Sequence, residues 1–535
     1  MTEYYGIQHS VIEWAYVSGT RDEATCHEVE LDVVVTDPEQ QEWKVPAFWA
    51  GGQDWRVRFS PRTPGVYHYR THCSDEQNGD LHGREGVLTV AAYQGNNPLL
   101  THGPLRVSAN RRYLEHLDGT PFFWLGDTWW MGLCQRNGWS FEDFRVLAAD
   151  RVKKGFSVIQ IVAGLYPDMP PFDPRGANEA GHPWEHDYTC INPAYFDRMD
   201  LRIHWLVKSG LVPCIVGCWG YFLPWMGLKK MKQHWRYLIA RYGAYPVVWC
   251  LAGEGAMPYY LSAQREADSA FQKRGWTEVG RYVRSIDPYH HPVTIHPNTT
   301  ARETVEESAV LDVDMLQTGH GGWGSVLNTL TLVNRAYTQA PSMPVINGEV
   351  CYEGHQQISW HDIQRFLFWT SMLSGAAGHT YGAGGIWQMN TREQPHGPSP
   401  HGGTYENTAW DVAMQLPGSH QLGLGKALLM RYPWFRFEPH PEWVEPRWSP
   451  QNYMLPFAAG IPGEVRVVYI PSRIYNWSGP VLQHLEDGIR YHARYVDPIS
   501  GHEYALGEVV ATADQTWQAP NVPLAQDWVL VLERH

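Results

Sequence analysis

The stretches LVPCIVGCW (211–219) and PVVWCLAGE (246–254) decide the fold. Both are nearly continuous runs of apolar residues, without the alternation of polar and apolar side chains that marks a strand with one face in water. Such runs are typical of parallel strands that are buried on both faces, as they are when helices cover the sheet. The sequence therefore predicts strands of a parallel sheet in these two places.

Six further strand-like segments lie between residues 110 and 430, and helical segments fit between them. The best marked helix has Asn192 as its cap, Pro193 in its first position and Gly210 at its end. Eight strand–helix units predict a (β/α)8 barrel over residues 101–430. The six segments are FFWLGDT (122–128), SVIQIVAG (157–164), PVTIHPN (292–298), DVDMLQTGH (312–320), PVINGEV (344–350) and GHTYGAGGIW (378–387).

The two ends of the chain have a different pattern of polar and apolar residues. Residues 1–100 contain short runs that alternate between polar and apolar side chains, such as GVYHYRTH (65–72), and residues 431–535 contain similar ones, such as RYHARYVDP (490–498). Short alternating strands separated by turn residues are the pattern of a β-sandwich. We therefore expect an α/β protein in which a central TIM barrel is flanked by two small β-sandwich domains.

The composition disfavours one class of ligand and favours another. The 535 residues include 42 Lys and Arg against 56 Asp and Glu, for a formal net charge of −14. This balance argues against nucleic acid as a partner, because binding to phosphates depends on basic residues. Aromatic residues make up 13% of the chain, with 26 Trp and 29 Tyr. Aromatic rings stack on the flat apolar faces of sugars, although large aromatic cores would give the same count.

The sequence predicts a cytoplasmic protein without a membrane partner. Its first twenty residues have neither a basic segment nor an apolar one, so no secretory signal is visible. The longest apolar stretch, at 366–378, is too short and too interrupted to span a bilayer. Four cysteines lie in strand-like runs and are expected to be buried thiols, as in a reducing compartment. They are Cys214, Cys218, Cys250 and Cys351.

Two glutamates end strands on opposite sides of the predicted barrel. Glu254 follows the fourth strand and Glu349 ends the seventh. Active sites of such barrels lie at the carboxyl ends of the strands, so both carboxylates are expected to point into one cleft. Hydrolysis of a glycosidic bond needs such a pair. One glutamate alone would more often be a solvated or structural residue, but the pair predicts Glu349 as the nucleophile and Glu254 as the acid/base, with Glu353 as a loop charge.

Other residues at the strand ends are candidates for binding the substrate. Their rings would form stacking walls and their polar groups would bind hydroxyls, although each tryptophan taken alone is equally well a core residue. Two loops, 165–191 and 388–410, are long enough to act as lids. The candidates are Asp127, Trp129, Trp130, Trp219, Tyr221, His296, Asn298, His320 and Trp387.

No metal or cofactor is predicted. His296 and His320 end strands five and six, where some barrel enzymes place metal ligands. The first strand, however, has no paired histidines and the eighth has no aspartate, so the ligand set would be incomplete. Neither a P-loop nor a dinucleotide-binding fingerprint is present.

Several motifs resemble those of the apiosidase-like glycoside hydrolases. They are DGTPFFWLGDTWW (118–130), NPAYFDRMD (192–200), WCLAGEG (249–255) and PVINGEV (344–350). The segment VRFSPRTPGVYHYR (57–70) resembles the immunoglobulin-like leading domain of that group. YVDPISGHEYALG (495–507) and DWVLVLE (527–533) resemble its trailing β-domain of the collagen-binding type, which is equally well a structural brace.

The resemblance implies a retaining enzyme of the clan A barrel type, with its carboxylates at Glu254 and Glu349. Many clan A enzymes carry asparagine immediately before the acid/base to hold the sugar 2-hydroxyl, whereas this chain has Gly253. The apiosidases themselves use aspartate as the acid/base, where this chain has the longer Glu254. This difference counts against apiose as the substrate.

The sequence as a whole predicts a glycoside hydrolase that acts by double displacement. Its partner would be a carbohydrate, from which it would trim terminal residues of small glycosides or oligosaccharides. Two other classes stay open. A carbohydrate-binding pseudoenzyme would keep the aromatic walls without needing either glutamate. A polysaccharide lyase would need a cationic cleft for uronates, which the net charge of −14 disfavours.

Overall fold

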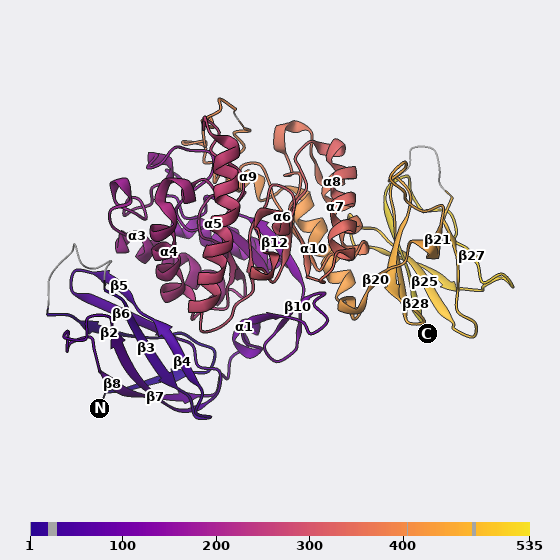
Figure 1. The fold of residues 1–535 in the computed structure, drawn as a ribbon. Coiled ribbons are helices and arrows are strands. Elements are labelled where there is room, and N and C mark those ends of the chain that lie inside the picture. The colour runs from indigo at the N-terminus through magenta and orange to yellow at the C-terminus, as the bar shows by residue number, and fades with distance from the viewer. Residues whose placement is uncertain (1, 20–28, 404, 473–477) are drawn as a thin grey trace.

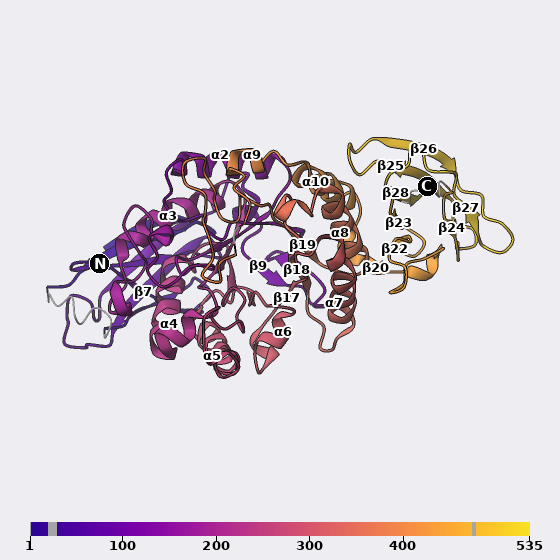
Figure 2. The same cartoon turned by 90° about the horizontal axis from the view of Figure 1, so that it is seen from above.

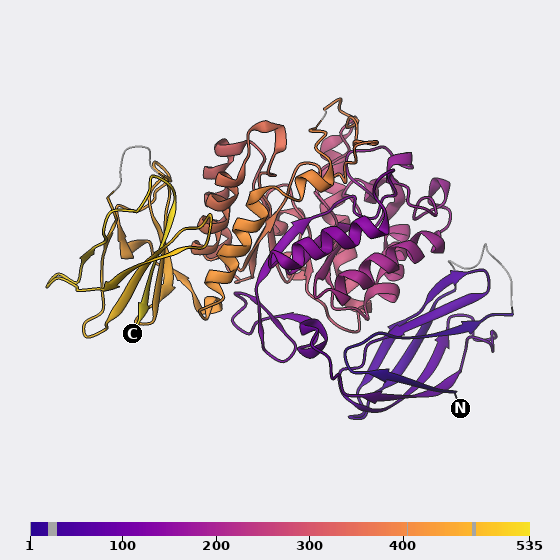
Figure 3. The same cartoon turned by 180° about the vertical axis from the view of Figure 1, so that it is seen from behind.

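The computed structural model describes residues 2–19, 29–403, 405–472 and 478–535. It has three parts in chain order, with a central barrel and one β-domain on each side of it (Figures 1 and 3). The two β-domains lie at opposite ends of the molecule. In the described part of the chain, no helix has both the length and the apolar character needed to cross a membrane.

The N-terminal domain is a sandwich of two sheets. Alternation along β7 points Tyr67 and Tyr69 inward, and the buried side chains of Trp14 and Val57 from the other sheet meet them in one core. Its larger sheet has the order β1 (Thr2–Ile7), β8 (Glu85–Ala91), β7 (Gly65–Cys73), β3 (Leu31–Thr36) and β4 (Glu42–Pro46). The smaller sheet consists of β2 (Ile12–Val17), β6 (Asp54–Phe59) and β5 (Phe48–Gly51).

The central domain contains an eight-stranded parallel sheet that is nearly closed, as the apolar runs predict. The edge strands β16 and β17 are not paired as a ladder. The backbone N–H of Asp312, just before β17, instead donates to the carbonyl of Val293 at 2.8 Å. In chain order the strands are β12 (Trp124–Thr128), β13 (Val158–Val162), β14 (Val212–Val216), β15 (Val248–Cys250), β16 (Val293–Thr294), β17 (Asp314–Gln317), β18 (Val345–Glu349) and β19 (Gly378–Tyr381).

Helices surround these strands (Figure 2). The helix after β13 begins at Pro193, as predicted, and turns Phe196 and Met199 toward the sheet. Asn192 holds the cap position, but its side chain donates to the carbonyls of the preceding loop at 2.8 and 3.0 Å. The helices are α2 (Phe141–Lys153), α3 (Pro193–Lys208), α4 (Phe222–Tyr242), α5 (Arg265–Ile286), α6 (Ala301–Thr304), α7 (Val326–Thr338), α8 (His361–Leu373), α9 (Trp410–Ala413) and α10 (Pro417–Leu429).

A short segment connects the N-terminal domain to the first barrel strand. It holds the helix α1 (Pro98–Thr101) and a small antiparallel sheet of β9 (Leu105–Val107), β10 (Leu114–His116) and β11 (Pro121–Phe122). Leu105 and Leu114 of this sheet are buried in the same core as the barrel strands. The connection is thus part of the barrel domain rather than a free linker.

The C-terminal domain is a second sandwich whose larger sheet is covered on both faces. Along β23, Val468 and Ile470 face the smaller sheet, whereas Val467 and Tyr469 belong to the barrel core. The larger sheet has the order β20 (Glu438–Pro439), β22 (Phe457–Ile461), β23 (Val465–Ile470), β28 (Trp528–Arg534), β25 (Tyr491–Val496) and β26 (Glu503–Glu508). The smaller sheet consists of β21 (Val444–Glu445), β24 (Val481–Leu482) and β27 (Trp517–Gln518).

Helix α8 fastens this domain to the barrel. The Trp369 ring stacks on the Tyr469 ring with their centroids 6.2 Å apart. Arg365 donates to both oxygens of Asp527, at 2.8 and 3.0 Å. A shared apolar core and a bidentate buried ion pair together make the C-terminal domain a brace for the barrel.

The N-terminal domain is held through Asp200, the last residue of the NPAYFDRMD motif. Asp200 Oδ2 lies 2.5 Å from Arg58 Nη2 on β6 and 2.9 Å from Arg241 Nη2 on α4. Burial alone would raise the pKa of this carboxyl, but the two guanidinium groups lower it to about 2. One carboxylate thus joins two barrel helices to the sandwich.

We expect Asp200→Asn to lower the free energy of unfolding by about 3–5 kcal/mol, because it takes from two buried cations the one buried anion that they share and leaves them only the more exposed Glu13 and Asp197. The pKa of Asp200 is depressed, so its contribution is complete above its ordinary pKa of 3.8 and is lost as the pH falls toward 2. Urea unfolding at pH 7 and at pH 3 measures both effects.

Asp197→Asn is the matched control. Asp197 also pairs with Arg241, but its side chain is 52% exposed, so we expect a loss below about 1 kcal/mol. Equal effects of the two substitutions would contradict the role assigned to Asp200.

Candidate active site

The carboxyl ends of the barrel strands surround a cavity of about 190 Å³. Both glutamates of the predicted pair line it. The remaining lining residues are mostly aromatic, polar or acidic, and the two exceptions are Pro167 and Met257. They are Trp130, Pro167, Asp168, Trp219, Met257, Tyr260, Gln317, His320, Tyr352, His355, Trp387 and Tyr405.

Glu349 is the last residue of β18, and its side chain is only 5% exposed. His320 Nε2 lies 2.6 Å from Oε1, and His296 Nε2 lies 3.1 Å from Oε2. Burial alone would raise the pKa of the Glu349 carboxyl, but His296 and His320 together hold it well below its ordinary value. The side chain is therefore an ionised carboxylate at neutral pH.

The two histidines are fixed differently. The backbone N–H of Glu254 donates to His296 Nδ1 at 3.5 Å, which assigns the proton of that ring to Nε2, the atom that faces Glu349. Burial lowers the pKa of His320, but its hydrogen bond to Glu349 and the charge of that carboxylate outweigh burial and raise it. His320 Nε2 is thus hydrogen-bonded to Glu349 Oε1, whereas His296 Nε2 lies close to Oε2 without a hydrogen bond to it.

Glu254 follows β15 in a backbone conformation that is rare for any residue but glycine, with a φ of 42°. Such conformations are costly and cluster at functional sites. Its Oε2 accepts a hydrogen bond from Trp219 Nε1 at 3.2 Å. Burial and the nearby charge of Glu349 raise the pKa of the Glu254 carboxyl to about 7. The pair thus has one ionised member and one that is partly protonated near neutral pH.

Gln317 joins the two carboxylates. Its Nε2 donates to Glu254 Oε1 and to Glu349 Oε1, at 3.1 Å in each case, so these two oxygens are at most twice 3.1 Å, or 6.2 Å, apart. A β-bulge between Leu316 and Gln317 pairs Gln317 with Glu349 across the strands. The sequence does not predict a role for Gln317, because a bulge redirects a side chain without leaving a signal in the hydrophobic pattern.

Four of the substrate-binding candidates line the cavity. Trp130, Trp219 and Trp387 supply aromatic walls, and His320 reaches in beside Glu349. Trp130 Nε1 donates to the hydroxyl of Tyr352, another wall residue, at 3.0 Å. This bond holds the two rings in fixed orientations.

The structure places the first-strand candidates elsewhere. Asp127 is fully buried, and its Oδ2 accepts from Arg151 Nε at 2.6 Å and from Trp129 Nε1 at 2.7 Å. Trp129 is fully buried too and packs edge-on against Phe144 of α2. Both residues fasten the first strand to α2 and do not line the cavity.

Three other candidates also lie outside the lining. His296 sits behind Glu349, as described above. The Tyr221 hydroxyl donates to the carbonyl of Tyr166 at 3.2 Å, and the residue is buried under the cavity wall. Asn298 is exposed beyond the end of β16. The reason is the same for each: a residue that follows a strand points inward or outward according to the local backbone, which spacing alone does not predict.

Loop residues contribute more than the sequence predicts. Asp168 comes from the loop 165–191 and Tyr405 from the loop 388–410, so both loops reach the cavity. Glu353 differs from the expected loop charge. It is fully buried and accepts from the Tyr381 hydroxyl at 2.6 Å and from the N–H of Gly418 in α10 at 3.0 Å. Its role is to join β19 to α10.

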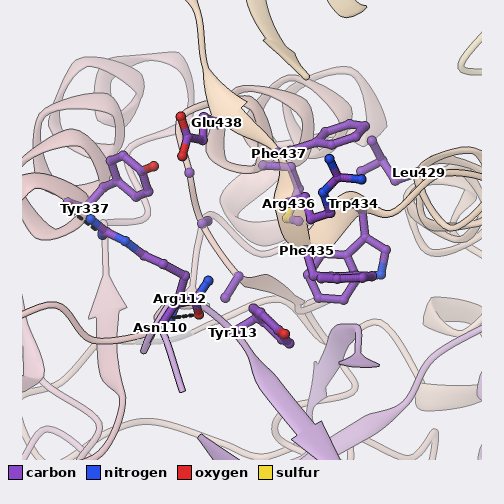
Figure 4. Close-up of a pocket in the computed structure, with 14 residues that line it drawn as sticks. Asn110, Arg112, Tyr113, Tyr337, Leu429, Trp434, Phe435, Arg436, Phe437 and Glu438 are labelled. Atoms are coloured by element: carbon purple, nitrogen blue, oxygen red, sulfur yellow. Dashed lines mark hydrogen bonds between the residues drawn. The ribbon is translucent and has the colours of Figure 1, made fainter. Parts of the chain in front are cut away.

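A second cavity, of about 140 Å³, lies at the opposite end of the barrel strands (Figure 4). Arg112 spans it with its guanidinium 4.3 Å from the centre of the Tyr337 ring and donates to the carbonyl of Tyr337 at 2.6 Å. Its only acidic lining residue is Glu438. It lacks a carboxylate pair, so the chemistry belongs to the first cavity. Among the described residues, no three His, Cys, Asp or Glu side chains gather as a metal site.

Solved structures with the same fold include a glycoside hydrolase, 23% identical, with a TM-score of 0.64, covering 82% of this chain and 98% of its own. A family 5 glycoside hydrolase from Bacteroides vulgatus is 22% identical, with a TM-score of 0.64 and coverage of 82% and 95%. A second Bacteroides vulgatus protein is 17% identical, with a TM-score of 0.72 and coverage of 99% and 100%. At these identities the similarity establishes the fold. No curated protein matches the chain.

Two family descriptions match the sequence itself. "Domain of unknown function (DUF5060)" matches residues 8–74, within the N-terminal sandwich. "Apiosidase-like, catalytic domain" matches residues 108–436, which is more than half of the chain and includes the whole barrel and both glutamates. The chain therefore belongs to the apiosidase-like family, and it is an enzyme that hydrolyses glycosidic bonds.

Proposed function

We propose that the enzyme is a retaining glycosidase that removes one terminal sugar at a time. Glu349 would attack the anomeric carbon while Glu254 protonates the leaving oxygen. Glu254 would then deprotonate water, which releases the sugar with its original configuration. The domain boundaries we propose are 1–100, 101–430 and 431–535.

The hydrogen bonds of Gln317 carry this proposal. Carboxyl groups of retaining enzymes lie about 5–5.5 Å apart, whereas those of inverting enzymes lie about 6.5–9.5 Å apart to leave room for water. The limit of 6.2 Å between the nearest oxygens of Glu254 and Glu349 supports direct attack by Glu349.

The protonation states support the assigned roles. Glu349 is ionised and so is ready to attack, whereas Glu254 has a pKa of about 7 and can hold a proton for the leaving group. Once Glu349 is esterified by the sugar, its charge is gone. The pKa of Glu254 then falls, because that charge is one of the two main causes that raise it. The same side chain is thereby converted from an acid to a base for the second step.

Cavity size and charge support a small neutral substrate. A cavity of about 150 Å³ can hold a benzene ring, so one of about 190 Å³ suits a single sugar ring better than an extended chain. No lysine or arginine is among the residues that line it. A polysaccharide lyase would need such cations to bind uronates, so this lining disfavours the lyase alternative.

We also propose that the enzyme is cytoplasmic. Cys73, Cys134, Cys214, Cys218, Cys250 and Cys351 are buried thiols in the structure, which suits a reducing compartment.

The pH dependence of kcat/KM should have its basic limb near pH 7. Glu254 must be protonated for the first step, so the rate is expected to fall about tenfold per pH unit above that value. In Glu349→Gln the pKa of Glu254 should fall, because the neighbouring charge is removed, while burial keeps it above its ordinary value of 4.5. Carbon-13 NMR titration of the Glu254 carboxyl measures this shift, and an unchanged pKa would contradict the electrostatic coupling of the pair.

Substitution of each glutamate should give a different pattern with aryl glycosides. Glu349→Gly is expected to lose roughly 10⁴-fold or more in kcat and to recover with azide, giving a glycosyl azide of inverted configuration. Glu254→Gly should keep its activity best on substrates whose leaving group needs no proton, and azide should give the retained product. Proton NMR of the products distinguishes the two.

Glu353→Gln is the matched control for these variants. This residue is as buried as Glu349 but does not line the cavity, so we expect activity within a few-fold of the wild type. Inverted product from the wild-type enzyme would refute the proposal of retention.

A further inference from the structure

A third carboxylate, that of Asp168, lines the cavity together with Glu254 and Glu349. It lies in the loop that follows β13, and the residue is only 7% exposed. Its φ of 56° is in the left-handed region, which aspartate tolerates better than most residues. Neither the motifs nor the two-step mechanism assigns it a role.

The two oxygens of Asp168 have different surroundings. Oδ1 accepts from the Tyr260 hydroxyl at 2.9 Å and from Ser399 Oγ at 2.7 Å. Tyr260 follows β15 and Ser399 follows β19, so loops after three different strands meet at this atom. Oδ2 receives no hydrogen bond from the described residues, and none of those that line the cavity is a lysine or an arginine. The carboxylate is thus oriented through one oxygen and has the other available.

The charge of Asp168 is unfavourable where it lies. Burial raises the pKa of its carboxyl, against the hydrogen bonds from Ser399 and Tyr260 and the nearby His401, which lower it, and the charge of Glu349 adds a smaller rise. An asparagine could accept the same two hydrogen bonds through its amide oxygen without carrying a charge. Joining the loops therefore does not require a carboxylate. A hydrogen-bond donor inside the cavity, by contrast, would require the carboxylate at this position.

We propose that Asp168 Oδ2 accepts a hydrogen bond from a hydroxyl of the terminal sugar and so makes the cavity select a neutral sugar with a free hydroxyl at that position. This inference rests on the proposed function. Sugar hydroxyls are donors, and a hydrogen bond to an ionised acceptor is about twice as strong as a neutral one. A substrate carboxylate at the same place would meet the charges of Asp168 and Glu349 and would be rejected.

The decisive variant is Asp168→Asn. Tyr260 and Ser399 both donate to one oxygen, so the asparagine is expected to keep its amide oxygen there and to turn its NH₂ group toward the cavity. The substitution therefore replaces an acceptor with a donor in the cavity while the loop contacts stay. Ser399→Ala is the control, because it removes a loop contact but leaves the carboxylate.

The experiment compares kcat/KM for the glycoside that the wild type hydrolyses with kcat/KM for its monodeoxy analogues, in the wild type and both variants. We expect the wild type to lose about 10²-fold or more on one analogue, because the buried acceptor is then left unpaired. Asp168→Asn should lose a similar factor on the parent glycoside and lose little more on that analogue. Ser399→Ala should discriminate among the analogues as the wild type does.

Two results would overturn the inference. One is an Asp168→Asn enzyme that hydrolyses the parent glycoside as fast as the wild type. The other is an Asp168→Asn enzyme whose kcat/KM falls by the same factor on the parent glycoside and on every monodeoxy analogue, which would indicate a purely structural role. Both leave the proposed hydrolysis intact. Failure of the proposed function would appear separately: the Glu349→Gly enzyme would then still hydrolyse the glycoside. Calorimetry of the parent glycoside with Glu349→Gln, and with the double variant that also carries Asp168→Asn, checks the contact without turnover. We expect the Kd of the double variant to be at least tenfold larger.

Discussion

The buried negative charge of Glu349 organises the mouth of the barrel. An ionised carboxylate that is 5% exposed needs compensating donors, and it has His320, His296 and Gln317 around it. Two of these three residues have a further connection. His296 accepts the backbone N–H of Glu254, and Gln317 also donates to the Glu254 side chain. Two of the residues around Glu349 therefore also contact Glu254, and the charge of Glu349 raises the pKa of the Glu254 carboxyl.

Most of the fold could be predicted from the sequence, because parallel strands buried on both faces leave an unmistakable apolar pattern. Each of the eight predicted runs contains an observed barrel strand, including the short β15 and β16. The pattern could not predict how the parts are joined. Arg365 and Asp527 lie 162 residues apart in the sequence. Their ion pair depends on the packing of α8 against the C-terminal sheet, which the hydrophobic pattern does not describe.

The site could be predicted as far as the topology determines it. Strands four and seven end on the same rim of any such barrel, which is why Glu254 and Glu349 could be paired without a structure. Gln317 and Asp168 could not be predicted as site residues. A β-bulge directs the side chain of Gln317, and a left-handed backbone conformation directs that of Asp168. Asp127 illustrates the converse. A polar residue at a strand end was a reasonable ligand candidate, but Arg151 of α2 reaches it from behind the strand.

Gly253 bears on the role that we propose for Asp168. A Cβ atom at position 253 would lie 2.1 Å from ring carbons of Trp219, so no other residue fits there without displacing that tryptophan. Trp219 cannot yield easily, because its Nε1 holds the Glu254 carboxyl at 3.2 Å. A side chain immediately before Glu254, such as the asparagine common in clan A enzymes, is thus excluded by the tryptophan that orients Glu254. In the proposed mechanism, contacts with the sugar hydroxyls therefore come from other parts of the rim, and the loops that meet at Asp168 place an acceptor in the same cavity.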